Sequence, residues 1–135
     1  MGLSRNRTAP TRAKIKALEA TLGFSFKNPS ILHLALVHRS YCNENGIDPA
    51  ECYERLEFLG DAVLELAVST ELYTRFPDAD EGELTKTRSS LVRGETLASI
   101  ARRIDLGRYL FVGKGVEITH GREQDSVLAA AFEAL

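Results

Sequence analysis

The 135-residue sequence is long enough for one domain around a single core, and its 44% apolar and 27% charged residues are ordinary for a globular protein. No apolar run approaches the about 20 residues of a membrane-spanning helix, and the N-terminus lacks the apolar segment of a secretion signal, so we expect a cytoplasmic protein with no membrane partner. The formal net charge of −2 argues against a basic body that holds nucleic acid by bulk electrostatics alone.

Helical periodicity dominates the sequence, and no segment alternates apolar and polar residues as a half-buried strand would, so we predict an all-α fold. The chain opens with arginines and lysines and has no acid before Glu19, a pattern that fits either a phosphate-binding arm or a solvated tail. We interpret residues 1–13 as a basic tail and residues 14–135 as the domain. A first helix is predicted over 10–22, and Gly23 ends it.

The second predicted helix begins at Pro29, after the capping residue Asn28, and continues through "ILHLALVHRSY". Cys42, just beyond it, and Cys52 match no metal or redox spacing. We interpret both as reduced structural thiols.

A long third helix is predicted to follow Asp48 and Pro49 and to end at Pro77. The fourth helix, over 78–92, has acids at its start and cations towards its end, which suits the helix dipole. A break at 93–94 separates it from the next helix.

The fifth helix is predicted over 95–104 and leads into a Gly-rich connection over 105–125. The last helix, 126–135, is predicted to be capped by Asp125 or Ser126. Because this helix is still running at the final residue, we expect the domain to be cut short at its C-terminal end.

The long helix has an apolar face and an acidic face, formed respectively by Leu56, Leu59, Val63 and Leu66 and by Glu54, Glu57, Asp61 and Glu65. A charged face is usually just solvated, but such faces interleave Lys or Arg at i+4, and this one does not. Like charges about 4 Å apart repel by about 4 kcal/mol at an effective dielectric constant of about 20. The uncompensated charge favours a site for a hard divalent cation, which carboxylates bind together with water.

Carboxylates on one helix cannot surround a metal ion, so a further acid must come from elsewhere in the chain. Glu133, on the last helix, is available for this role. From composition alone, a simple surface residue is an equally good interpretation of Glu133.

Several segments carry a resemblance to a known family. The stretch "ERLEFLGDAVLELA" looks like the signature of the ribonuclease III family. Further segments resemble family segments in order and spacing: "LALVHRSY", "EGELTKTRSSLV", "ETLASIAR", "LGRYLFVGKGVE" and "GREQDSVLAAAFEAL". The resemblance covers nearly everything from residue 14 to residue 135, and ordered matches are far more specific than a lone motif. By contrast, the "GKG" at 113–115 is no dinucleotide or P-loop fingerprint.

The resemblance implies an all-helical, metal-dependent endonuclease domain that forms a homodimer and cleaves double-stranded RNA in RNA processing, that of ribosomal RNA included. Mg²⁺ is the implied cofactor, and Mn²⁺ is expected to substitute for it. Divalent ions activate water for attack at phosphorus and stabilise the leaving oxygen, so the protein need supply mainly carboxylates and geometry. The family commonly adds a double-stranded RNA-binding domain, and we expect none within these residues.

The resemblance also implies roles for individual acids. Glu57, Asp61 and Glu133 fall on metal-ligand positions of the catalytic site. Glu54 falls on a further acid of the catalytic signature with a less direct role. Glu65 matches no family position, and we interpret it as a surface acid.

Phe58 is an aromatic residue on the polar side of the long helix, beside the acids. A partly exposed Phe needs no explanation by itself. The resemblance supplies one, because it implies that Phe58 is a dimer contact that packs into the partner subunit.

Two positions depart from the family pattern. Tyr53 stands where the family usually has Asn, a change that we expect to be tolerated. Ala130 stands where the family has Asp, and alanine cannot coordinate a metal. Because Ala130 lies i,i+3 from Glu133, the departure halves the second pair of carboxylates.

The leading interpretation is an endonuclease whose activity Ala130 could impair. The alternative is a catalytically silent domain of the same fold that serves as an RNA-binding or structural component of a ribonucleoprotein. Ala130 favours the alternative, whereas the acids that remain favour the enzyme.

Overall fold

A computed structural model of the protein describes residues 12–135, so the predicted tail of residues 1–13 falls almost wholly outside the described residues. Over the described range the chain is helical, and its one pairing of extended segments is an isolated bridge between Val37 and Phe111, which confirms the predicted all-α fold. In chain order the elements are α1 (Arg12–Leu22), α2 (Pro29–Ala35), α3 (Arg39–Asn45), η1 (Pro49–Glu51), α4 (Glu54–Arg75), α5 (Glu81–Val92), α6 (Gly94–Arg103), η2 (Leu106–Tyr109), α7 (Lys114–Ile118), η3 (Gly121–Glu123) and α8 (Asp125–Ala134).

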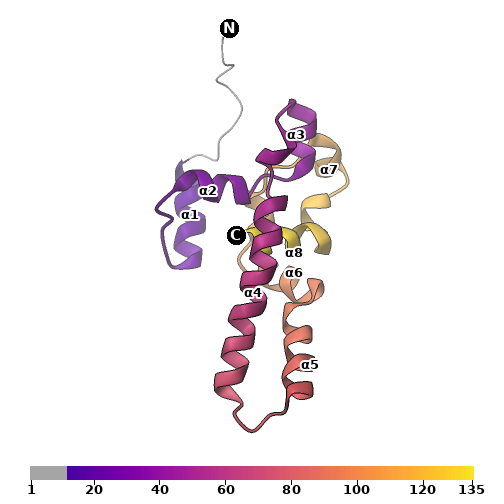
Figure 1. Cartoon of the computed structure of the whole chain (residues 1–135). Helices are drawn as coiled ribbons and strands as arrows, with labels where there is room; N and C mark the ends of the chain where they lie inside the picture. Colours follow the sequence, from indigo (N-terminus) through magenta and orange to yellow (C-terminus); the bar gives the residue numbers. More distant parts are fainter. Residues whose placement is uncertain (1–11) are drawn as a thin grey trace.

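The helices form a packed body and a projecting arm (Figure 1). In the body, α8 lies against both α4 and α6, while α3 and α7 sit together at one end. The arm consists of the C-terminal half of α4 and of α5, which returns beside it. Within these two helices, both fully described, only Leu72 is buried. No helix within residues 12–135 combines the length and the apolar composition needed to cross a bilayer.

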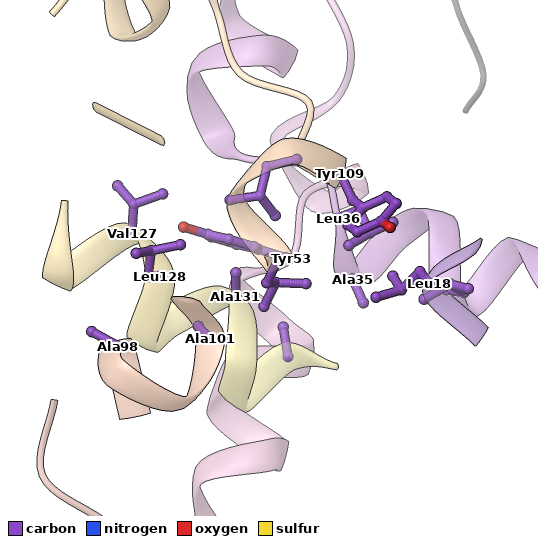
Figure 2. Close-up of a cluster of buried hydrophobic side chains, with 14 residues drawn as sticks. Leu18, Ala35, Leu36, Tyr53, Ala98, Ala101, Tyr109, Val127, Leu128 and Ala131 are labelled. Carbon is purple, nitrogen blue, oxygen red and sulfur yellow. The ribbon is translucent and has the colours of Figure 1, made fainter. Parts of the chain in front are cut away.

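The hydrophobic core lies where α6, α8 and the segment between them meet α1, α2 and the residue before α4 (Figure 2). Ala98 and Ala101 of α6 and Ala131 of α8 belong to this buried cluster, and such small side chains let two helices pack closely. Leu106 and Leu128 are completely buried within it. Helix α8, which carries the predicted site residue at its C-terminal end, is therefore firmly held.

The second predicted helix is interrupted, because residues 36–38 leave the helix and pair with the segment around Phe111. The amide of Phe111 donates to the carbonyl of Leu36, and the amide of His38 donates to the carbonyl of Phe111, each at 2.9 Å. Helix α3 then begins afresh with His38 as its cap, whose ring Nδ1 accepts a hydrogen bond from the Ser40 amide at 3.1 Å. The prediction of one continuous helix through this segment is therefore wrong.

Two predicted helix starts also differ from the structure. Asp48 caps the short turn η1, whereas α4 begins at Glu54. Neither Asp125 nor Ser126 caps the last helix, because Asp125 is already its first residue and accepts a hydrogen bond from Arg102 instead. The predicted Gly-rich connection contains the short elements η2, α7 and η3.

Candidate active site

Helices α4 and α8 touch at a glycine. A Cβ atom placed on Gly60 would lie 1.6 Å from the backbone oxygen of Glu133, closer than real side chains ever come. Gly60 therefore permits a backbone approach that any other residue would prevent, which offsets the about 1 kcal/mol that glycine costs inside a helix. Because Glu57 and Asp61 flank Gly60 on α4, the contact brings both acids towards Glu133 of α8.

The carboxylates at this contact interact with one another. Partial burial, and then the negative charges of Asp61 and Glu57, raise the pKa of Glu133 above its usual value. Partial burial, and then the charges of Glu54 and Asp61, raise the pKa of Glu57. Among residues 12–135, Glu57, Asp61 and Glu133 form no salt bridge. The site is a cluster of negative charge without a counter-charge.

The donor atoms of this cluster suit a hard divalent cation, because Mg²⁺ is commonly bound by one or two carboxylates and several waters. The part of the chain that the structure describes holds no group of three or more Asp, Glu, His or Cys side chains arranged to bind a metal ion. The structure thus brings Glu57, Asp61 and Glu133 within electrostatic reach of one another without gathering them into a complete ligand cage. An ion held here would take part of its coordination from water.

The other two acids of the acidic face of α4, Glu54 and Glu65, are not at the contact between Gly60 and Glu133. Glu54 contacts Arg39 of α3, with 3.5 Å between its Oε1 atom and the Nη1 atom of the guanidinium. Glu65 is exposed further along the helix. Tyr53, directly before Glu54, is only 4% exposed and belongs to the core, and it gives α4 no side-chain cap.

Ala130 lies one helical turn before Glu133 on α8, where its methyl group packs, partly buried, against the core. Side chains spaced i,i+3 share a helix face, so this is a position from which another carboxylate could join Glu133. The methyl group offers no donor atom, and the acids at the contact are therefore two from α4 and one from α8.

Phe58 projects from α4 with 83% of its surface exposed and lines a groove of about 600 Å³. The walls of this groove come from α2, η1 and the first turns of α4, and they include Leu34 and Ala50. Most of the apolar face of α4 is uncovered as well, although Leu56 at its start packs, partly buried, against the core. Exposure along that face is 58% to 69% at Leu59, Val63 and Leu66.

Sequence reasoning missed two residues that shape the site. Gly60 carried a usable signal, since a glycine inside a strongly helical stretch and between two acids indicates a close backbone approach. Arg39 lies in the quoted family segment "LALVHRSY", but no local pattern linked it to Glu54, because the rest of α3 and η1 lie between them and only the fold brings the two side chains together.

Comparisons with known proteins agree on one family. A family model described as Ribonuclease-III-like matches residues 28–135. The protein named Ribonuclease 3 from Desulforamulus reducens is 53% identical over 118 residues, which are 87% of this chain and 48% of that protein. Ribonuclease 3 from Dehalococcoides mccartyi is 48% identical over 118 residues, which are 87% of this chain and 50% of that protein. The chain spans about half the length of these curated relatives.

Among solved structures, the nuclease domain of Ribonuclease III from Campylobacter jejuni superimposes with a TM-score of 0.81 at 38% identity. The match covers 89% of this chain and 80% of that one. The Campylobacter structure is described as showing flexibility in a region involved in dimer formation.

Proposed function

The chain belongs to the ribonuclease III-like family, and on that premise we propose that it is a metal-dependent nuclease domain that cleaves double-stranded RNA. The observation that carries the proposal is the contact between Gly60 and Glu133, because it unites acids of α4 and α8 in one negatively charged site. A phosphodiester is itself an anion, so such a site suits it only when cations are bound there.

In this proposal, Glu57, Asp61 and Glu133 hold Mg²⁺, or Mn²⁺ in its place, directly or through water. Bound there, the ion supplies the charge that activates a water molecule and stabilises the leaving oxygen of the phosphodiester. The contribution of the chain itself is positional. The close packing at Gly60 lets the two helices, and with them the carboxylates, come together, and the partial burial of Glu57 and Glu133 strengthens the charge interactions of these two side chains.

We also propose a homodimer with two-fold symmetry, in which Phe58 of each chain enters the groove on the other. Two-fold interfaces use the same surface on both subunits, so a projecting side chain and a groove that adjoin on one surface can satisfy each other. Phe58 and its groove adjoin in this way. The exposed face at Leu59, Val63 and Leu66 would be covered in the same interface.

A catalytically silent RNA-binding or structural component of a ribonucleoprotein is the second candidate, and Ala130 is the observation that favours it. Loss of one carboxylate from a metal site weakens the hold on the ion. The acids at the contact with Gly60 support the enzyme instead, because a site released from catalysis has no need to maintain an unfavourable cluster of like charge.

The experiment that tests the proposal is cleavage of an end-labelled RNA duplex by the protein in Mg²⁺, in a chelator, and with Glu57→Gln. We expect cleavage of the duplex in Mg²⁺, none in the chelator and none by the variant, with the separated single strands as the substrate control. Duplex binding without cleavage, for the protein and for Ala130→Asp alike, would favour the silent alternative. If the protein neither binds nor cleaves the duplex, both candidate functions are overturned.

A further inference from the structure

Arg39 reaches the acids of α4 from outside that helix. Its guanidinium lies 3.5 Å from the carboxylate of Glu54, and the two side chains are 58% and 47% exposed. Within residues 12–135, Glu54 is the one polar partner of this guanidinium. An arginine side chain carries several N–H donors, so most of those on Arg39 remain free for another acceptor.

The backbone that presents Arg39 is held on both sides. His38 caps α3 through its ring nitrogen, and its ring packs edge-on against Tyr53 with 5.6 Å between the ring centroids. The amide of Tyr53 in turn donates to the carbonyl of Val37 at 2.9 Å. Since Tyr53 directly precedes Glu54, both partners of the ion pair start from one rigid junction.

This ion pair is poorly suited to stabilise the fold, because exposed pairs held through a single contact contribute little. It is well suited to receive a ligand. Glu54 lies one helical turn before Glu57, so Arg39 stands at the end of the acidic site. A phosphodiester that approaches the acids is repelled, and a cation at their border reduces that repulsion. Guanidinium groups also match the phosphate oxygens with paired hydrogen bonds.

We propose that Arg39 binds a backbone phosphate of the RNA duplex beside the acidic site, and that Glu54 is the positioning residue that holds its guanidinium. The inference rests on the proposed function, because it names a contact with the same substrate. It gives Glu54 a role that requires no coordination of metal.

The test measures the affinity of a short RNA duplex for the protein, Arg39→Gln and Arg39→Lys over a series of salt concentrations. A chelator is present, so the acids carry no bound ion and the charge of Arg39 matters most. We expect Arg39→Gln to weaken binding about tenfold at low salt and to reduce the slope of log affinity against log salt by about 1. Arg39→Lys keeps the charge, so it should keep most of the slope and lose part of the affinity.

Arg93→Gln is the matched control, because Arg93 forms another exposed ion pair at 3.5 Å, with Glu95. It should leave affinity and slope unchanged. The positioning role of Glu54 is tested by a double-mutant cycle, in which Arg39→Gln should weaken binding less when Glu54→Gln is already present. Additive effects would overturn the positioning role.

The outcomes separate the two proposals. If the protein binds duplex RNA and Arg39→Gln binds it with the same affinity and salt slope, the inference about Arg39 is wrong and the proposed function stands. If the protein binds no duplex RNA, with or without Mg²⁺, both are wrong. Thermal unfolding of Arg39→Gln and Arg39→Lys should match that of the unchanged protein, so a loss of binding reports a lost contact.

Discussion

The backbone of Gly60 in α4 lies directly against the backbone carbonyl of Glu133 in α8, so the spacing of these helices is set where the acids meet. Any side chain at position 60 must push α8 away and carry Glu133 with it. The geometry of the site therefore depends on a residue that has no chemistry of its own.

Gly60→Ala should destabilise the protein by about 2 kcal/mol or more, the usual cost of forcing extra atoms into a packed interior. Urea unfolding followed by circular dichroism measures it. Gly94→Ala is the control, because the nearest atom to its added Cβ, on Ala129, is 4.0 Å away, and it should change stability little. Equal stability of Gly60→Ala and the unchanged protein would contradict the close contact.

Glu57→Gln and Glu133→Gln should each weaken the binding of Mg²⁺ or Mn²⁺, because each removes one of the few charged ligands that we propose for the site. Isothermal titration of the metal into the protein checks this. Glu65→Gln, on the same helix but exposed, should leave binding unchanged. If both variants bind the metal with unchanged affinity, Glu57 and Glu133 are not its ligands.

Ala130→Asp should raise the rate of duplex cleavage by orders of magnitude, because small misplacements of reacting groups cost about a hundredfold in rate. Affinity for RNA should change little, since phosphate contacts come from basic groups. Single-turnover cleavage and a binding titration separate the two quantities. If the protein with Ala130 already cuts as fast as the variant, the additional carboxylate is dispensable.

Phe58→Ala should convert the proposed homodimer into monomers, because it removes the side chain that we propose fills the groove of the partner. Sedimentation velocity at micromolar concentration measures the change. Ile118→Ala is the matched control, since Ile118 is 78% exposed on α7, away from the groove, and should leave the dimer intact. A purely monomeric unchanged protein would count against the interface.

Glu44→Gln should lower the stability of the protein at neutral pH and flatten its loss of stability in acid. The carboxylate of Glu44 accepts hydrogen bonds from the amides of Lys114 at 2.7 Å and Gly115 at 3.2 Å, which lower its pKa. A pKa that is lower in the folded state stabilises the fold above the unfolded-state pKa, and this contribution is lost as pH falls through the folded-state pKa. Melting temperatures from pH 7 to pH 3 provide the test, and an unchanged profile would refute it.

Local signals in the sequence predicted the elements that end at strong breakers. The long helix ends at Arg75, before Pro77, and α5 and α6 are separated at Arg93, as Pro77 and the break at 93–94 indicated. The interruption after α2 was missed, because histidine is not among the usual capping residues and the apolar repeat runs on across His38.

Periodicity also identified which residues of α4 share a face, but not which face the rest of the protein covers. Of the predicted apolar face, Leu56 packs partly buried against the core, whereas Leu59, Val63 and Leu66 are exposed and α8 packs against the side of Gly60. The pairing of Arg39 with Glu54 depends on tertiary structure and left no trace in local sequence.

The arm and the body should open on different timescales. Leu72 is the one buried side chain of α4 and α5, both of which the structure describes in full. The arm made by α5 and the distal half of α4 therefore has a low free energy of local unfolding. Its amide hydrogens should exchange with solvent while those of the body stay protected. Helix α4 is thus clamped by α8 at the acids and loosely held at its far end. Local unfolding of the distal half of this helix should therefore leave Glu57 and Asp61 in place, because they lie on the half that α8 holds.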